Sequence, residues 1–351
     1  MHKTGSSSIQ QSLCGIERGN IKYLDLGAPN HSGLLSTIFR ENPERYHGNI
    51  KAGRSAEEVF ALRESYKKTL RNQAATADKE HSVISAEDLS HPLGEDYVKK
   101  IKDFLSPYFD GFKVVGYVRS PVSFMQSAFQ QIVKGGGSAL DVWKLYPRYE
   151  DRFSPYDRVF GSDNVHLIPF DSKFLVDGDV VKDFASRIDV HLSESEIVRS
   201  NESLSLEATS LLFAYRKFGP GYGAYRGATR ENNLLIEALK ELGEEKLRFH
   251  GDLVNPVLSQ NEHDIRWMEG RLGAALDEAG SMSEAAIKNE GDLLAIAETE
   301  AKGLAKLFDR ALDETCSPKK IAEVIDLLRH CLAGSRKPRP EPRTCYLKRR
   351  I

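Results

Sequence analysis

The chain opens with a short run of small, hydroxyl-bearing residues that leads directly into a helix pattern, in which Ile9 and Leu13 are four residues apart. The first backbone N–H groups of a helix lack partners within the helix and lie at its positive end, so such a start can bind an anion. The candidate binding residues are Lys3, Thr4, Gly5, Ser6, Ser7 and Ser8.

Each residue type in this loop suits a phosphate or sulfate group. Gly5 lets the backbone approach the anion closely, the serine hydroxyls can donate hydrogen bonds, and Lys3 supplies a mobile positive charge. A Walker A loop instead has its lysine after the second glycine. With no evident magnesium-binding aspartate, a kinase or NTPase is disfavoured. The alternative is a serine-rich helix cap with a nearby lysine.

A second candidate anion site follows the clearest strand pattern, residues 113–118 (KVVGYV). Arg119 stands at the carboxyl end of that strand, the edge at which open α/β sheets bind ligands. A serine and a proline follow, which suit a helix start, and Ser123 and Ser127 would share one helix face. A guanidinium with a hydroxyl one or two turns along can bind an anion. The alternative is a salt bridge to a surface carboxylate.

Together these segments resemble the superfamily of sulfotransferases that use 3′-phosphoadenylyl sulfate (PAPS). Residues 3–9 (KTGSSSI) are similar to its 5′-phosphosulfate loop, and residues 114–127 (VVGYVRSPVSFMQS) to its 3′-phosphate segment, with Arg119 and Ser127 in the matching places. Bacterial carbohydrate-type sulfotransferases look closest, with weaker matches at residues 85–87 (SAE) and 201–205 (NESLS).

The resemblance implies sulfuryl transfer from PAPS to a hydroxyl or amine of a carbohydrate or similar acceptor, without a metal. Lys3 would then neutralise the leaving phosphate, and a general base would accept the proton of a hydroxyl acceptor. Glu87 is our first candidate for the base because it follows a short strand at the ligand edge, and His31 and His91 are the second and third. A solvated glutamate and structural histidines are the alternatives.

The start of the chain departs from the family pattern. A buried strand precedes the phosphosulfate loop in that family, whereas Met1 is almost in the loop itself. Loss of a central strand would expose the hydrogen bonds and core surface of its neighbours. We therefore expect the true start to lie upstream, together with any targeting segment. An inactive, truncated relic of a sulfotransferase is the alternative.

Strand patterns alternate with helix patterns over the first half of the chain, and these elements must position the candidate residues. Strand patterns separated by helices predict an α/β fold with a P-loop-like parallel sheet flanked by helices. Strands are predicted at residues 21–26, 82–85, 113–118 and 164–170, and helices at 55–72 and 95–104.

From about residue 178 the pattern becomes helical, with a glycine-rich loop at 219–227 that could cover the donor or acceptor. Helices are predicted at residues 207–218, 231–242, 262–279 and 291–313. The resemblance covers residues 1–275, which we expect to form a sulfotransferase-like domain. Residues 276–332 are predicted to be a helical extension and residues 333–351 a disordered basic tail.

Composition sets the class of protein. The chain has 351 residues, a formal net charge of −2 and 28% charged residues, typical of a soluble globular protein and unlike a strongly basic nucleic-acid binder. The four scattered cysteines indicate free thiols in a reducing compartment and disfavour a zinc site. Without a membrane span or signal peptide pattern, we expect a cytoplasmic protein. The competing function is a P-loop kinase or another nucleotide-binding protein such as a nucleotidase, which would bind ATP in the presence of Mg²⁺.

Overall fold

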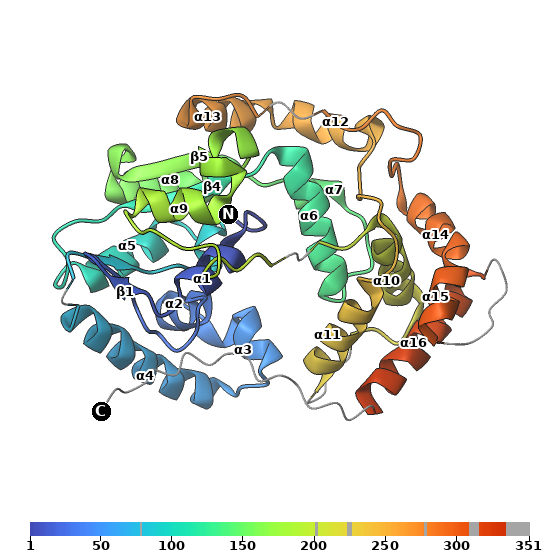
Figure 1. Ribbon diagram of the computed structural model, residues 1–351, viewed down its shortest axis with the longest axis horizontal. Helices are drawn as coiled ribbons and strands as arrows, with labels where there is room; N and C mark the ends of the chain where they lie inside the picture. Colours follow the sequence, from blue (N-terminus) through green and yellow to red (C-terminus); the bar gives the residue numbers. More distant parts are fainter. Residues whose placement is uncertain (78, 201–202, 223–226, 277–278, 309–315, 335–351) are drawn as a thin grey trace.

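Two small β-sheets form the strand framework of the part of the chain described by this computed structural model (Figure 1). The first contains β1 (Glu17–Arg18), β2 (Ile21–Tyr23) and β3 (His81–Val83), with β1 antiparallel and β3 parallel to β2. The second pairs β4 (Val114–Val118) with β5 (Val165–Pro169) in parallel. The fold is therefore mixed α/β, and its strands contribute few residues compared with its helices.

The structure describes residues 1–351 except 78, 201–202, 223–226, 277–278, 309–315 and 335–351. Within the described part, a strand forms at each of the four predicted places: β4 and β5 cover nearly all of the predicted residues, β2 covers only the first half of 21–26, and β3 begins one residue before the predicted 82–85 and ends two residues earlier. β2 stops at Tyr23 because its partner β3 offers only three residues for pairing, with Tyr23 opposite Val83. No described helix is both long enough and apolar enough to cross a bilayer.

The single P-loop-like sheet is not what the structure shows. β3 and β4 belong to different sheets, and the N-terminal segment contacts both of the regions in which they lie. The Met1 amino group donates to the Tyr117 carbonyl oxygen in β4 at 2.7 Å, and the Lys3 N–H points to Glu87, just beyond β3.

Helices surround both sheets and, with the loops that join them, form most of the remaining described residues. The chain up to residue 187 contains α1 (Ser6–Leu13), α2 (Ser32–Phe39), α3 (His47–Lys51), α4 (Ala56–Ala75), α5 (Glu95–Leu105), α6 (Pro121–Lys134), α7 (Val142–Leu145), α8 (Tyr149–Phe160) and α9 (Val180–Arg187). The described residues after 187 contain α10 (Leu206–Phe218), α11 (Ala228–Leu239), α12 (Gly251–Gln260), α13 (Glu262–Leu272), α14 (Glu290–Thr299), α15 (Ala301–Phe308) and α16 (Pro318–Gly334).

Local sequence signals set several helix boundaries. Ser55 and Glu58 form a reciprocal capping box at the start of α4, and α6 begins at Pro121, as predicted. Helix α13 ends at Leu272 because Gly273 adopts a φ of 62°, which terminates helices. The helix predicted to extend to residue 279 was therefore too long. The helix predicted over 291–313 is divided near residue 300 into α14 and α15.

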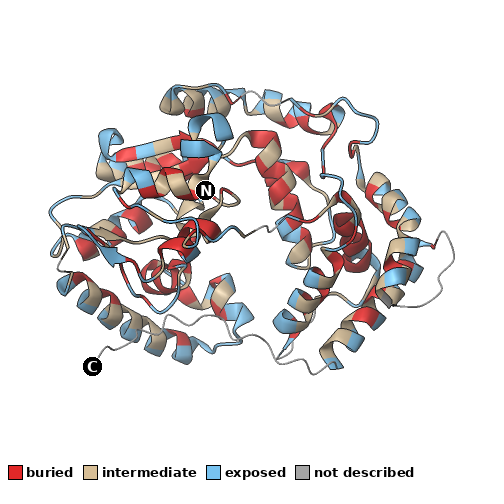
Figure 2. Cartoon of the chain, in the orientation of Figure 1, coloured by how far each residue is buried: buried red, intermediate tan, exposed pale blue. Residues whose placement is uncertain are grey.

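Helix α6 joins two hydrophobic regions, with the strands on one side and helices α10, α11 and α14–α16 on the other (Figure 1). Phe124 packs in a cluster with Val118 of β4, whereas Phe129 belongs to the largest cluster, which extends through α10. Figure 2 shows that α6 and α10 are largely buried. Leu293 and Ile325 of the C-terminal helices belong to the same large cluster. The predicted division into domains stays a prediction.

A substitution of Phe129 tests the packing at the centre of the largest hydrophobic cluster. Its fully buried ring lies 5.8 Å from the Phe213 ring and 5.9 Å from the Phe249 ring, centre to centre. Phe129→Ala should lower the free energy of unfolding, measured in urea, by about 3–5 kcal/mol. Ile132→Ala on the same helix is the control, because Ile132 is 43% exposed, and should cost less than about 1 kcal/mol. Equal losses in the two variants would contradict this packing.

Candidate functional site

The loop at residues 3–5 turns the chain sharply into α1. Lys3 and Gly5 have positive φ angles of 64° and 74°, a region that glycine adopts easily. A Cβ atom at Gly5 would come within 2.5 Å of Val180 Cγ1. The positive φ and the close approach to Val180 both favour glycine at position 5. A glycine there lets the start of α1 pack against the start of α9.

Thr4 secures this loop from within. Its side chain is buried, and its hydroxyl donates to the Met1 carbonyl oxygen at 2.6 Å. Because Met1 is in turn hydrogen-bonded to Tyr117, the loop is held at the carboxyl end of β4. The Thr4 hydroxyl is thus used inside the protein, and a role for Thr4 in ligand binding stays a prediction.

Arg119 connects the two segments that were predicted to bind anions. Its Nη1 donates to the Lys3 carbonyl oxygen at 2.8 Å, and its Nε donates to Ser123 Oγ at 2.5 Å. The guanidinium carbon lies 5.8 Å from the centre of the Phe170 ring. Ser127 lies one turn beyond Ser123 on α6 and is buried. The structure therefore places the residue after β4 directly beside the loop before α1.

Glu87 reaches the same loop from the other sheet. It begins η2 (Glu87–Ser90), a short 3₁₀ turn after β3, and its Oε1 accepts the Lys3 N–H at 3.4 Å, a long hydrogen bond. Lys3, Glu87 and Arg119 are thus brought together from three separate parts of the sequence.

His31 is placed differently. Only 1% of the residue is exposed, and its Nδ1 accepts the Ser85 N–H at 3.2 Å. Burial lowers the pKa of His31 to about 4, so the ring is neutral at physiological pH. These contacts give His31 a structural role in holding the start of α2 against the end of β3, and its role as a base stays a prediction.

His91 lies at the end of η2, next to a second histidine. Its ring is 4.2 Å from the His2 ring, centre to centre, and its Nε2 is 3.8 Å from Asp88 Oδ1. Burial, and then the nearby charge of His2, lowers the pKa of His91 to about 3. Burial opposes ionisation of Asp88, but hydrogen bonds from His2 and Tyr46 hold the pKa of this carboxyl below its usual value.

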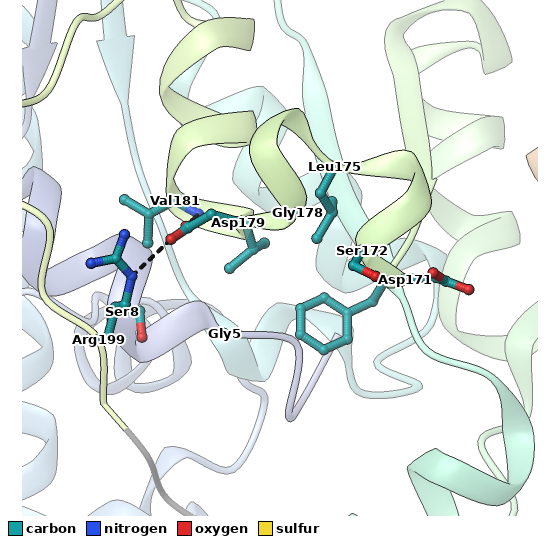
Figure 3. A pocket seen from close by; sticks show the side chains of 11 residues that line it. Gly5, Ser8, Asp171, Ser172, Leu175, Gly178, Asp179, Val181 and Arg199 are labelled. Atoms are coloured by element: carbon teal, nitrogen blue, oxygen red, sulfur yellow. Dashed lines mark hydrogen bonds and ion pairs between the residues drawn. The ribbon is translucent and has the colours of Figure 1, made fainter. Parts of the chain in front are cut away.

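A pocket of about 550 Å³ opens beside the start of α1 (Figure 3). One side comes from α1 and its preceding glycine, and the other from the chain between β5 and the first turn of α9, with Arg199 beyond α9. The lining residues are Gly5, Ser8, Phe170, Asp171, Ser172, Leu175, Gly178, Asp179, Val180, Val181 and Arg199.

An ion pair crosses one side of this pocket. Arg199 Nε donates to Asp179 Oδ2 at 2.9 Å (Figure 3), and Ser8 Oγ accepts the Ser200 N–H at 3.1 Å. Sequence reasoning missed Phe170, Asp179 and Arg199. Phe170 could have been predicted, because it is the last residue of a predicted strand. In a parallel sheet, the carboxyl end of that strand would lie at the same edge as Arg119. Arg199 had none, because it lies in an irregular segment.

Two weaker predictions fall partly outside the described residues. Residues 201–202, and residues 223–226 of the glycine-rich loop, are among those that the structure does not describe. Tyr222 of that loop donates from its hydroxyl to Thr229 Oγ1 at 3.4 Å, and its ring lies 5.7 Å from the Arg216 guanidinium carbon. A Cβ atom at Gly136, just beyond α6, would come within 2.9 Å of Tyr222 Cβ, so Tyr222 lies against the end of α6 as well as against α10 and α11.

Comparison with known proteins adds no assignment: no family model matches the chain, and neither a curated protein nor a solved structure matches it. The chemistry of the site therefore has to be argued from its own residues.

Gly5 provides a direct test of the loop geometry. Gly5→Ala should lower the melting temperature and the free energy of unfolding, by at least about 1–2 kcal/mol, because the backbone is left-handed and the added Cβ meets Val180. Gly33→Ala is the matched control: Gly33 lies in α2, and a Cβ there would have no neighbour within 4 Å. That variant should be neutral or more stable by up to about 1 kcal/mol. A fully stable Gly5→Ala variant would rule out the loop conformation described.

Proposed function

We propose that the protein is a sulfotransferase that takes a sulfuryl group from PAPS and transfers it to a hydroxyl or amine of a carbohydrate or similar acceptor. The observation that carries this proposal is the 2.8 Å hydrogen bond from Arg119 to the Lys3 carbonyl oxygen. It joins the two candidate anion-binding segments into one site. A ligand held there by both segments needs two separated anionic groups, which PAPS has.

The donor would lie across the start of α1. The positive end of the helix and the serine hydroxyls would hold the 5′-phosphosulfate, and Arg119 would hold the 3′-phosphate. The neighbouring pocket has a volume typical of small-molecule sites. Phe170 offers an aromatic face there, which suits the adenine base.

The arrangement of strand ends supports a P-loop-like organisation of this site, which we also propose. Glu87 follows β3, Arg119 follows β4 and Phe170 follows β5. Contacts among the Lys3 backbone, Glu87, Arg119 and Phe170 bring these three ends to one place. Ligand sites of open α/β sheets form at such carboxyl ends.

In the proposed reaction, the acceptor oxygen attacks the sulfur of PAPS in line with the bond that breaks. A new S–O bond forms to the acceptor while the bond between sulfur and the bridging phosphate oxygen breaks. Lys3 would stabilise the negative charge that develops on the leaving phosphate. Glu87 would take the acceptor's proton, because its carboxylate lies beside the same loop. Atoms and charge balance without an oxidant or reductant.

Nucleotide binding tests the donor site. Calorimetry with adenosine 3′,5′-bisphosphate in the presence of a chelator should show binding to the wild type and at least tenfold weaker binding to Arg119→Ala. Lys3→Ala should reduce turnover more than affinity. Arg266→Ala, which changes an exposed arginine of α13, is the control and should bind normally. Binding of ATP that requires Mg²⁺, with none of the bisphosphate, would instead favour a kinase.

The role of Glu87 as the general base can be tested separately from donor binding. Glu87→Gln keeps an oxygen that can accept the Lys3 N–H but cannot take a proton at neutral pH. It should lower the rate of sulfuryl transfer to a hydroxyl acceptor by about 10²–10⁴-fold and leave binding of adenosine 3′,5′-bisphosphate within about twofold. Glu80→Gln, on the exposed turn before β3, is the control. Full activity of Glu87→Gln would remove this residue from the mechanism.

A further inference from the structure

Two imidazoles and a carboxylate form a compact group beside the proposed site. Among the described residues, His2, Asp88 and His91 place possible ligand atoms within 4.8 Å of one another. Asp88 Oδ1 lies 3.2 Å from His2 Nε2 and 3.8 Å from His91 Nε2. Ligand atoms about 2.0–2.1 Å from a tetrahedral zinc ion are about 3.3 Å apart. Small side-chain movements would therefore bring all three into a metal's coordination sphere.

Hydrogen bonds around His2 orient its ring. The Ser90 hydroxyl donates to the Glu87 carbonyl oxygen at 2.8 Å, and Ser90 Oγ lies 3.2 Å from His2 Nδ1. His2 Nε2 then faces Asp88 Oδ1 at 3.2 Å. A proton on Nε2 makes this contact a hydrogen bond, and a metal ion bound by the neutral ring and the carboxylate would take the place of that proton.

Hydrogen bonds also orient the Asp88 carboxylate. The Tyr46 hydroxyl donates to Asp88 Oδ2 at 2.7 Å, and Ser32 Oγ accepts the Asp88 N–H at 3.0 Å. These contacts hold Oδ1 toward the two imidazoles. Metal-binding histidines and carboxylates are commonly held by such outer hydrogen bonds.

The two imidazole nitrogens and the carboxylate oxygen also indicate which kind of metal ion would bind. Imidazole suits zinc and the other late first-row divalent ions, whereas magnesium and calcium prefer oxygen ligands alone. His47 lies near the group, with its Nε2 3.8 Å from Asp88 Oδ2 and more than half of its side chain exposed. His47 thus lies beside the oxygen that Tyr46 holds, and it is not one of the three candidate ligands.

We propose that His2, Asp88 and His91 bind a divalent transition-metal ion, for which zinc is the best match. This departs from the metal-free site that the family resemblance implies. His2 precedes Lys3 and Asp88 follows Glu87, so a bound ion would fix the segment that carries the proposed cation against the turn that carries the proposed base. That positioning role rests on the proposed function, whereas metal binding itself does not.

Spectroscopy with cobalt tests this site without using activity. The full chain, freed of metal with a chelator, should bind one Co²⁺ per chain with visible absorption bands, and Zn²⁺ should displace it. His91→Ala and His2→Ala should each weaken binding at least tenfold. His81→Ala is the control, because His81 is exposed on β3 away from the cluster, and should bind like the wild type. Circular dichroism establishes that each variant is folded.

Stoichiometric binding that depends on His91 and His2 supports the proposal. Lack of stoichiometric Co²⁺ binding, or equal binding by all three histidine variants, would overturn it and leave a proton shared by His2 and Asp88. Adenosine 3′,5′-bisphosphate is titrated into the same samples to separate the two proposals. Nucleotide binding without metal binding rejects the metal site alone, and metal binding without nucleotide binding rejects the sulfotransferase assignment alone.

Discussion

The hydrogen bond between the Arg119 guanidinium and the Lys3 carbonyl oxygen joins two segments separated by 116 residues. Arginine offers several donors in a planar fork, so it can hold a backbone oxygen with one nitrogen while others face a ligand. Here a second nitrogen donates to Ser123 at the start of α6. The position of the loop before α1 therefore depends on the end of β4 and on the helix that follows it.

The rest of the site is arranged around this contact. Gly5 allows α1 to start against α9, and Glu87 brings the turn after β3 to the opposite side of the loop. The pocket beside α1 continues the same surface toward Phe170 and Arg199. Backbone amides, the Arg119 and Arg199 guanidinium groups and a few hydroxyls thus gather groups of the kinds that can bind anions, in a chain with a formal net charge of −2. Such local concentration lets a protein bind an anion without a basic surface.

Local patterns predicted most elements of this fold because they depend on neighbours in sequence. The apolar run of β4 and the serine and proline after it indicate a strand and a helix start without knowledge of the rest of the chain. The extent of β2 could not be read in this way, because it is limited by the length of β3. The separation of β3 and β4 into two sheets likewise depends on contacts between distant segments.

The candidate site follows the same rule: residues with a local sequence signal were predicted, and those placed by long-range contacts were not. Lys3, Gly5, Glu87 and Arg119 carry local signals, since each lies where a strand or loop meets a helix or turn. His31 could not be distinguished from a catalytic histidine, because its burial results from packing between β2, α2 and β3. Asp88 and its histidine neighbours were missed as a group, because His2 reaches them from 86 residues away.

The contribution of the 3′-phosphate to binding tests the joint site most directly. The ratio of dissociation constants for adenosine 5′-monophosphate and adenosine 3′,5′-bisphosphate should be at least about ten in the wild type, because a charge-assisted hydrogen bond is lost with the monophosphate. In Arg119→Ala the ratio should fall close to one. A wild-type ratio near one, or a ratio that Arg119→Ala leaves unchanged, would show that the two segments do not hold opposite ends of one nucleotide.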